Sequence, residues 1–248
     1  MKLVLFDIDG TLLSAGGAGR RAIERALIEV FGETGPAEHR FDGKTDPQIV
    51  RELMTLAGHD DARINRGMDA LLQRYVELLP GELAAPSHVS PRTYPGVTEL
   101  LDAVESRPDA ILGLLTGNLA QGAAAKLSAV GIDPDRFVVG AFGSDHETRG
   151  ALPAIARNRA RELLGIDIAG TDVVVIGDTP ADIACGQSLG ARAIGVATGH
   201  YTVDQLSACR PAAVFSDLSD TAAVLRAIMN ESDPSTAAGS AASTVVSR

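Results

Sequence analysis

Tryptophan is absent from the chain, and aromatic residues make up only 4% of its 248 residues. Hydrophobic residues nevertheless reach 45%, so the core must be built mainly from alanine, leucine, valine and isoleucine. Small aliphatic side chains suit the close packing of helices on a sheet. A chain of this length can form one large α/β domain, or a main domain with a smaller inserted one.

Cysteine is also scarce, with Cys185 and Cys209 as the only two. They form neither a disulfide framework nor a metal-binding cluster, which indicates a reducing compartment. No apolar run approaches membrane-spanning length, and the apolar stretch in MKLVLFDIDG is too short, and too acidic downstream, for a signal peptide. We therefore expect a cytoplasmic protein with no membrane partner.

Positive charge is in deficit, because the formal net charge is -10. This excess of negative charge repels the phosphates of nucleic acids at long range, so we expect no nucleic-acid partner. A small phosphorylated molecule would need a local positive site, which a metal ion and a few Lys or Arg side chains can supply. The oligomeric state is left open.

Short apolar runs recur along the chain, at Leu3–Phe6, Ile111–Leu115, Val138–Phe142, Val173–Ile176, Ala193–Val196 and Ala213–Phe215. Continuous apolar character is typical of strands that are buried on both faces, as in a parallel sheet. Helical patterns lie between these runs, with one stripe at Val97, Leu100, Leu101 and Val104 and another at Ile155, Ala156, Ala160 and Leu163. This alternation predicts an α/β fold, a doubly wound parallel sheet with a Rossmann-like core and right-handed crossovers.

One stretch breaks the alternation, because no strand run occurs between about Gly17 and Pro86. Helical spacing persists there in three stripes, at Ile23, Leu27 and Val30, at Ile49, Leu53 and Leu56, and at Ile64, Met68, Leu71, Tyr75 and Leu78. We interpret residues 16–91 as an inserted helical cap and residues 1–15 and 92–230 as the core. The alternative is one elaborate connection. The Ser/Ala/Thr-rich tail, residues 231–248, is expected to be disordered.

Polar residues directly follow three of the predicted strands. They are Asp7-Ile8-Asp9-Gly10-Thr11, Thr116-Gly117-Asn118 and Gly177-Asp178-Thr179-Pro180-Ala181-Asp182. Ligands of an open parallel sheet bind beyond the carboxyl ends of its strands, so these residues should converge on one edge. Four carboxylates in one place repel one another unless a cation lies among them, and an all-oxygen set suits Mg²⁺.

Such a set permits phosphoryl transfer. Asp7 and Asp178 are placed to bind the ion, and the Asp7 carboxylate can then attack phosphorus to form an aspartyl-phosphate. Asp9 can protonate the leaving alcohol and later deprotonate water. Thr116 and the amides after it can hold phosphate oxygens, with Asn118 beginning a helix whose positive end faces the phosphate.

These motifs make the chain resemble the haloacid dehalogenase-like superfamily, since DIDGT matches its first motif, LLTGN its second and GDTPAD its fourth. The resemblance runs from Met1 to about Met229, and a helical cap at this place is typical of the phosphoglycolate phosphatase-like (C1) members. It implies a Mg²⁺-dependent phosphatase that hydrolyses a small phosphate monoester metabolite. It further implies Asp7 as nucleophile and metal ligand, Asp9 as acid/base and backbone ligand, Asp178 as metal ligand, and Asp182 as support for the metal site.

The third motif of the family usually places a lysine at the start of the helix before the fourth-motif strand. The corresponding stretch here, TRGALPAIARNRARELLG, contains no lysine. We assign the role to Arg149, which lies nearest the start of the helix, with Arg157 and Lys126 as alternatives. An arginine presents a fork of donors where a lysine presents a point charge.

In the predicted cap, Phe41–Pro47 forms a polar turn before a helix, with Thr45 or Asp46 as its expected N-cap. Related caps contact the substrate with a loop here, which makes Lys44 and Arg20 candidates for binding the leaving group. Two other functions stay open: a phosphomutase acting on a sugar phosphate, with a cap that excludes water, and a catalytically silent binding relative. Retention of Asp7 and Asp9 disfavours the silent relative.

Overall fold

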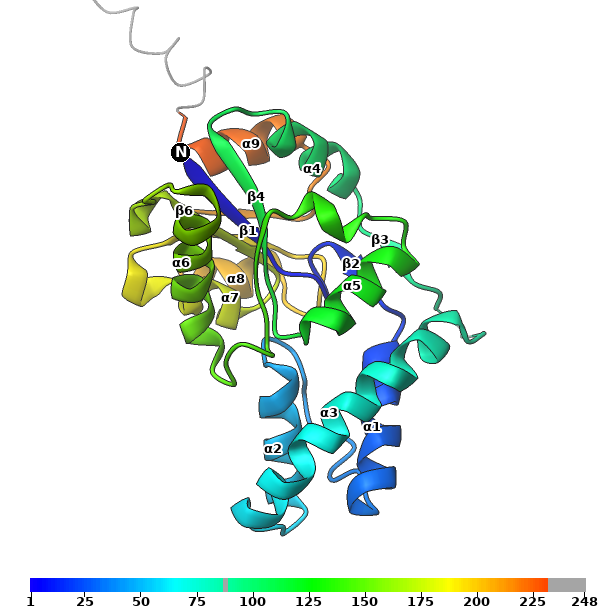
Figure 1. Cartoon of the computed structure of the whole chain (residues 1–248). Helices are drawn as coiled ribbons and strands as arrows, with labels where there is room; N and C mark the ends of the chain where they lie inside the picture. Colours follow the sequence, from blue (N-terminus) through cyan, green and yellow to red (C-terminus); the bar gives the residue numbers. More distant parts are fainter. Residues whose placement is uncertain (87–88, 232–248) are drawn as a thin grey trace, which may run out of the picture.

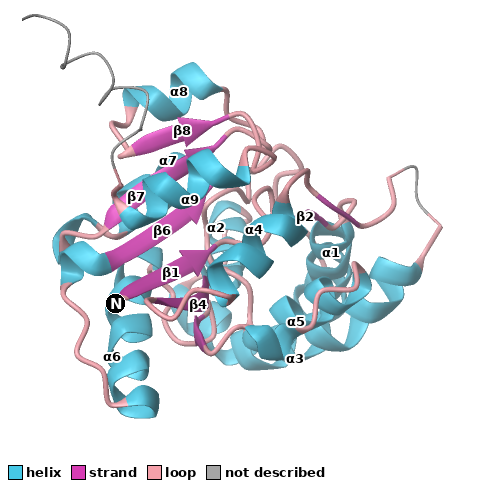
Figure 2. Ribbon diagram, turned by 90° about the horizontal axis from the view of Figure 1, so that it is seen from above, coloured by secondary structure: helices cyan, strands magenta, loops and turns pink. Residues whose placement is uncertain are grey.

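The computed structural model describes residues 1–86 and 89–231 of the chain. Its main sheet has six strands in the order β5-β4-β1-β6-β7-β8, all in parallel pairs. The strands are β1 (Lys2–Phe6), β4 (Ala110–Leu115), β5 (Val139–Ala141), β6 (Val173–Gly177), β7 (Arg192–Val196) and β8 (Ala213–Phe215). Each of the six predicted apolar runs therefore supplies one strand, and the doubly wound α/β prediction is confirmed (Figure 2).

Both faces of this sheet are buried, which explains why its strands are continuously apolar. Val4 and Phe6 share a core cluster with residues of α4 (Val97–Glu105), α5 (Ala120–Ala129) and α9 (Thr221–Met229). Leu3 and Leu5, on the opposite face, share a cluster with α6 (Leu152–Leu164). The short helix α7 (Pro180–Cys185) packs against β6 and β7, and α8 (Val203–Ala208) packs against β7 and β8.

Two residues of the predicted stripes are exposed, contrary to expectation. Leu163, in the last turn of α6, has 65% of its surface exposed, and Leu56, at the end of its helix, has 60%. The strand β5 against which α6 packs is only three residues long, so the end of the helix has little sheet to cover. Helical spacing alone does not reveal where the partner surface stops.

Three helices follow β1 before the sheet resumes: α1 (Ala18–Phe31), α2 (Asp46–Leu56) and α3 (Asp61–Ala84). Figure 1 shows them as a group beyond the carboxyl ends of β1 and β4. Thr45 caps α2 by accepting a hydrogen bond from the Gln48 amide at 3.3 Å. We call residues 18–84 the helical segment; its interpretation as a separate cap domain stays a prediction. No helix in the described part of the chain has both the length and the apolar character needed to cross a membrane.

A second, two-stranded sheet joins the two crossings between the core and the helical segment. In it β2 (Leu13–Ser14) pairs antiparallel with β3 (Arg92–Thr93). The sequence analysis did not predict this ribbon, because strands of two residues carry no periodic pattern. Most of the predicted tail, residues 232–248, lies outside the described residues.

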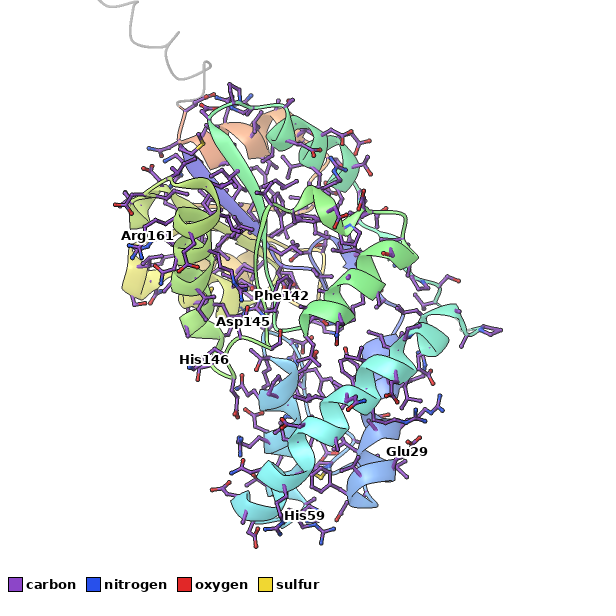
Figure 3. The ribbon with its side chains drawn as sticks, viewed as in Figure 1. Glu29, His59, Phe142, Asp145, His146 and Arg161 are labelled. Carbon is purple, nitrogen blue, oxygen red and sulfur yellow. The ribbon has the colours of Figure 1, made fainter. Side chains whose placement is uncertain are left out.

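The helical segment touches the loops at the carboxyl edge of the sheet directly. The Thr45 hydroxyl donates to the Glu147 carbonyl oxygen at 2.6 Å, and the Asp46 amide donates to the Gly117 carbonyl oxygen at 2.8 Å. Figure 3 shows Phe142, Asp145 and His146 on the connection between β5 and α6, which also carries Glu147. Loops of the core and helices of the segment thus enclose one common space.

One close backbone approach is expected to be indispensable for the fold. Gly96, at the start of α4, has a φ of +77°, and a Cβ added there would lie 2.1 Å from the Leu218 carbonyl. We expect Gly96→Ala to lower the free energy of unfolding by at least about 2 kcal/mol, measured by chemical denaturation. Gly81, exposed in α3 with no atom within 4 Å of an added Cβ, is the matched control. Gly81→Ala should raise the same quantity by about 0.5–1 kcal/mol. Equal stability of the two variants would contradict this account.

Candidate active site

The polar residues predicted to form the site lie together because of the strand order. Strand β1 lies between β4 and β6, so the carboxyl ends of these three strands are neighbours. This is the topological switch point, because the chain adds β4 and β5 on one side of β1 and the later strands on the other side. Asp7 follows β1, Thr116 follows β4 and Asp178 follows β6. All three side chains are buried.

Three carboxylates form a compact cluster at this edge. Asp7, Asp178 and Asp182 each offer an oxygen atom, and these atoms all lie within 4.8 Å of one another. Two glycines leave the room that Asp178 occupies, because a Cβ at Gly10 would lie 2.3 Å, and one at Gly199 1.8 Å, from Asp178 Oδ2. A side chain at either position would therefore displace the Asp178 carboxylate.

The cluster carries more negative charge than its surroundings neutralise. Burial raises the pKa of Asp7 to about 6, with the charges of Asp182 and Asp9 adding to the effect and Arg149 opposing it. Burial, together with the charges of Asp182 and Asp7, raises the pKa of Asp178 well above its ordinary value. Three buried carboxylates that offer only oxygen atoms fit a small divalent cation, which would favour their ionised forms.

Arg149 is the positive group of this cluster. Its Nη2 atom lies 3.0 Å from Asp7 Oδ1 and also pairs with Asp182 Oδ1, and only 6% of the residue is exposed. The structure therefore places the first of the three predicted cations beside the predicted nucleophile. Arg157 lies on α6 and is not among the described residues that line the cavity.

Asp182 has two sets of contacts. One oxygen pairs with Arg149, while Oδ2 accepts hydrogen bonds from the Thr179 amide at 3.0 Å and the Thr179 hydroxyl at 2.6 Å. The second set closes a capping box at the start of α7. Asp182 therefore caps a helix and belongs to the carboxylate cluster at the same time.

A second buried cation lies at Asp9. Lys126 Nζ donates to Asp9 Oδ2 and to Asn118 Oδ1, both at 2.6 Å. Asn118 Nδ2 donates to the same Asp9 oxygen and to Thr116 Oγ1, both at 2.8 Å. The expectation that Asn118 begins a helix is wrong, because α5 starts at Ala120, and the Asn118 side chain is turned to Asp9 and Lys126.

The carboxylate cluster opens on a cavity of about 800 Å³ that is lined by both the core and the helical segment. Arg20 and Lys44, the predicted leaving-group contacts, both line it. The Arg20 guanidinium lies 3.9 Å from the centre of the Phe41 ring, and Lys44 Nζ lies 2.5 Å from Glu52 Oε2. Gly117 must be a glycine, since a Cβ there would lie 1.9 Å from the Lys44 carbonyl oxygen.

Two residues of the helical segment that sequence reasoning did not assign to the site also line this cavity. Asp46 Oδ2 accepts a hydrogen bond from the Leu119 amide, 73 positions away, at 2.9 Å. Burial raises the pKa of Asp46 to about 6, and the Lys126 ammonium opposes this shift. Tyr75 is fully buried, as its helical stripe predicts. Neither residue carries a motif that would have revealed its contact with the core.

Comparisons with known proteins agree with this geometry. The family of haloacid dehalogenase-like hydrolases matches residues 4–187. A phosphoglycolate phosphatase of Rhodospirillum rubrum is 28% identical over 224 residues, which cover 87% of each chain. A 5′-nucleotidase of Pseudomonas aeruginosa is 26% identical over 224 residues, or 90% of this chain and 94% of its own.

A solved structure has the same fold. The crystal structure of a predicted phosphoglycolate phosphatase from Haemophilus somnus 129PT superposes with a TM-score of 0.66 at 21% identity. The superposition covers 91% of this chain and 98% of the other. With its carboxylate cluster at the sheet edge and a family match over most of its length, this chain belongs to the haloacid dehalogenase-like hydrolase family.

Proposed function

We propose that this protein is a Mg²⁺-dependent phosphatase that hydrolyses a small phosphate monoester through an aspartyl-phosphate intermediate. The observation that carries the proposal is the buried cluster of Asp7, Asp178 and Asp182 beside Arg149, two of whose carboxylates, Asp7 and Asp178, line the same cavity as Asp9. The names of the two relatives, phosphoglycolate phosphatase and 5′-nucleotidase, support removal of phosphate without selecting one substrate.

Asp7 and Asp178 would bind Mg²⁺ directly, with Asp182 beside them and the backbone of Asp9 completing the protein ligands. Bound there, Mg²⁺ supplies positive charge that reduces the repulsion between an anionic nucleophile and an anionic phosphate. The fit rests on the oxygen-only donors and on the raised pKa of Asp7, which burial and the neighbouring charges of Asp182 and Asp9 cause and which a cation would oppose.

The reaction then follows from the positions of the side chains. One Asp7 oxygen forms a bond to phosphorus while the bond to the leaving alcohol breaks, and Asp9 gives its proton to the leaving oxygen. In the second half Asp9 takes a proton from water, which attacks the aspartyl-phosphate, releases phosphate and frees Asp7. Arg149 orients Asp7 through Oδ1, and Thr116 and the Gly117 amide are proposed to hold phosphate oxygens.

The remainder of the substrate would lie in the part of the cavity that the helical segment covers. A volume of about 800 Å³ accommodates a small metabolite. Arg20 and Lys44 are proposed to contact the leaving group, which suits a substrate with polar or anionic groups beyond its phosphate. A phosphomutase acting on a sugar phosphate is the second candidate, because the contacts of Thr45 and Asp46 with the core favour exclusion of water.

Release of inorganic phosphate from a panel of phosphorylated metabolites tests the function. We expect release in Mg²⁺ and none in EDTA, and Asp7→Asn should lower the rate by at least about three orders of magnitude. Asp69→Asn, which removes an exposed carboxylate of α3, is the matched control and should leave the rate unchanged. Turnover of β-glucose 1-phosphate without phosphate release would favour the mutase. Absence of turnover on every substrate would contradict both.

The assignment of Arg149 has its own test. Arg149→Met removes the positive charge beside Asp7, and we expect kcat/KM for phosphate release to fall by about 10²-fold to 10³-fold. Arg157→Met, on the helix that follows Arg149, should retain the wild-type value. If Arg149→Met is as active as the wild type, Arg149 does not neutralise the nucleophile and the phosphate.

The proposed metal site predicts that Asp178→Asn is more stable than the wild type without Mg²⁺ and gains less stability from Mg²⁺. Because burial and neighbouring carboxylates raise the pKa of Asp178, this carboxyl group lowers the stability of the metal-free protein once the pH exceeds its ordinary pKa. Thermal unfolding in EDTA should therefore show a higher midpoint for Asp178→Asn than for the wild type. Mg²⁺ at about 100 times its Kd should stabilise the wild type by about 2.7 kcal/mol and the variant by much less. Equal Mg²⁺-dependent shifts in the two proteins would exclude Asp178 as a ligand.

The raised pKa of Asp7 predicts the pH range over which Mg²⁺ begins to stabilise the protein. A carboxyl group whose pKa is raised to about 6 contributes stability below its ordinary pKa and loses it as the pH rises through about 6. The stabilisation by Mg²⁺ should therefore be small at about pH 4 and increase as the pH rises through about 6, and the same unfolding measurements made across this range check it.

A further inference from the structure

We propose that Lys126 is a positioning residue for Asp9: with Asn118 it engages one oxygen, Oδ2, and so reserves the other, Oδ1, for the proton that passes to the leaving group. This inference rests on the proposed phosphatase function and deepens it. It assigns Lys126 a role different from neutralising the nucleophile, which is the role proposed for Arg149 beside Asp7.

The two oxygen atoms of Asp9 have different surroundings. Oδ2 accepts hydrogen bonds from Lys126 Nζ at 2.6 Å and from Asn118 Nδ2 at 2.8 Å. Within residues 1–86 and 89–231, no side chain or backbone group donates to Oδ1. The Asp9 side chain keeps 43% of its surface exposed and lines the cavity, so it is open to a substrate there.

Hydrogen-bond chemistry then selects the oxygen that carries the proton. An oxygen that faces two N–H donors cannot also hold a proton without opposing their hydrogens. Oδ1 faces no such donor, so the transferable proton resides on it. Transfer breaks the Oδ1–H bond and forms the O–H bond of the leaving alcohol, and Asp9 is left as a carboxylate that can later accept a proton from water.

Lys126 also determines which way Asn118 points. An ammonium group has donors only, so Asn118 must turn its oxygen towards Lys126, at 2.6 Å. Its amide nitrogen is thereby directed to Asp9 and Thr116, both at 2.8 Å. One buried lysine thus orients two donors on Asp9 and connects them to the predicted phosphate-binding threonine.

The helical segment covers this lysine. Only 5% of Lys126 is exposed, and a Cβ added at Gly19 of α1 would lie 3.1 Å from Lys126 Nζ. The Tyr75 hydroxyl of α3 lies close to both α1 and α5, because it would be 3.9 Å from the Cβ added at Gly19 and 3.5 Å from a Cβ added at Gly122. Asp46 of α2 adds a negative charge close enough to be affected by the Lys126 ammonium. Lys126 is therefore confined to the position from which it reaches Asp9.

The test compares leaving groups of different acidity. Substrates would be para-substituted phenyl phosphates of similar shape, and kcat/KM reports the half-reaction in which the leaving group departs. A 4-nitrophenolate departs without help from an acid, whereas the more basic phenolates need a proton. For Lys126→Met we expect kcat/KM to fall by less than about five-fold with 4-nitrophenyl phosphate and by about 10²-fold with 4-methoxyphenyl phosphate.

For each variant, the ratio of kcat/KM between two substrates does not depend on how much of the enzyme is folded, because a smaller amount of active enzyme lowers the apparent kcat/KM of all substrates by the same factor. Asp9→Asn should show the same steepened dependence, and the Asp9→Asn/Lys126→Met double variant should be no steeper than Asp9→Asn alone. Arg157→Met is the matched control and should keep the wild-type dependence. A uniform fall across the series for Lys126→Met, or an additive double variant, would overturn the proposal. Wild-type enzyme that hydrolyses none of the series in Mg²⁺ would instead contradict the proposed function, and the inference with it.

Discussion

The mutual repulsion of three buried carboxylates is the constraint on which the site depends. Asp7, Asp178 and Asp182 approach within 4.8 Å because three neighbouring strands end at the same edge and because Gly10 and Gly199 leave room for Asp178. The Arg149 guanidinium opposes the rise in the pKa of Asp7 that burial and the neighbouring carboxylates cause, but the pKa still reaches about 6. Such a cluster is costly for the fold and useful for binding a cation, which is typical of functional sites.

Two buried cations lie beside the two aspartates that follow β1, one at each. Arg149 comes from the turn before α6 and meets Asp7, while Lys126 comes from α5 and meets Asp9. Each is held by its own set of partners, so neither can replace the other. The helical segment covers Lys126 and contributes Asp46, Arg20 and Lys44 to the cavity that Asp7 and Asp9 also line.

Much of this arrangement was predictable from local patterns. The apolar runs gave all six strands of the sheet, since strands buried on both faces must be apolar throughout. The position of Asp7, Thr116 and Asp178 after those runs then implied one common edge. Predictions failed where a partner surface ends, as at Leu163, and where pairing involves only two residues, as between Leu13 and Thr93. The start of α5 was also predicted two residues too early, at Asn118, whose side chain instead contacts Asp9 and Lys126.

By itself, the sequence determined the fold class, the family and the carboxylates of the site, because these depend on periodicity and on short contiguous motifs. Only the tertiary structure decided which cation lies beside which aspartate. Lys126 reaches Asp9 across 117 positions, and Asp46 meets Leu119 across 73. Contacts of this kind arise from the packing of whole elements against one another, and no local pattern encodes the direction in which a buried side chain will point.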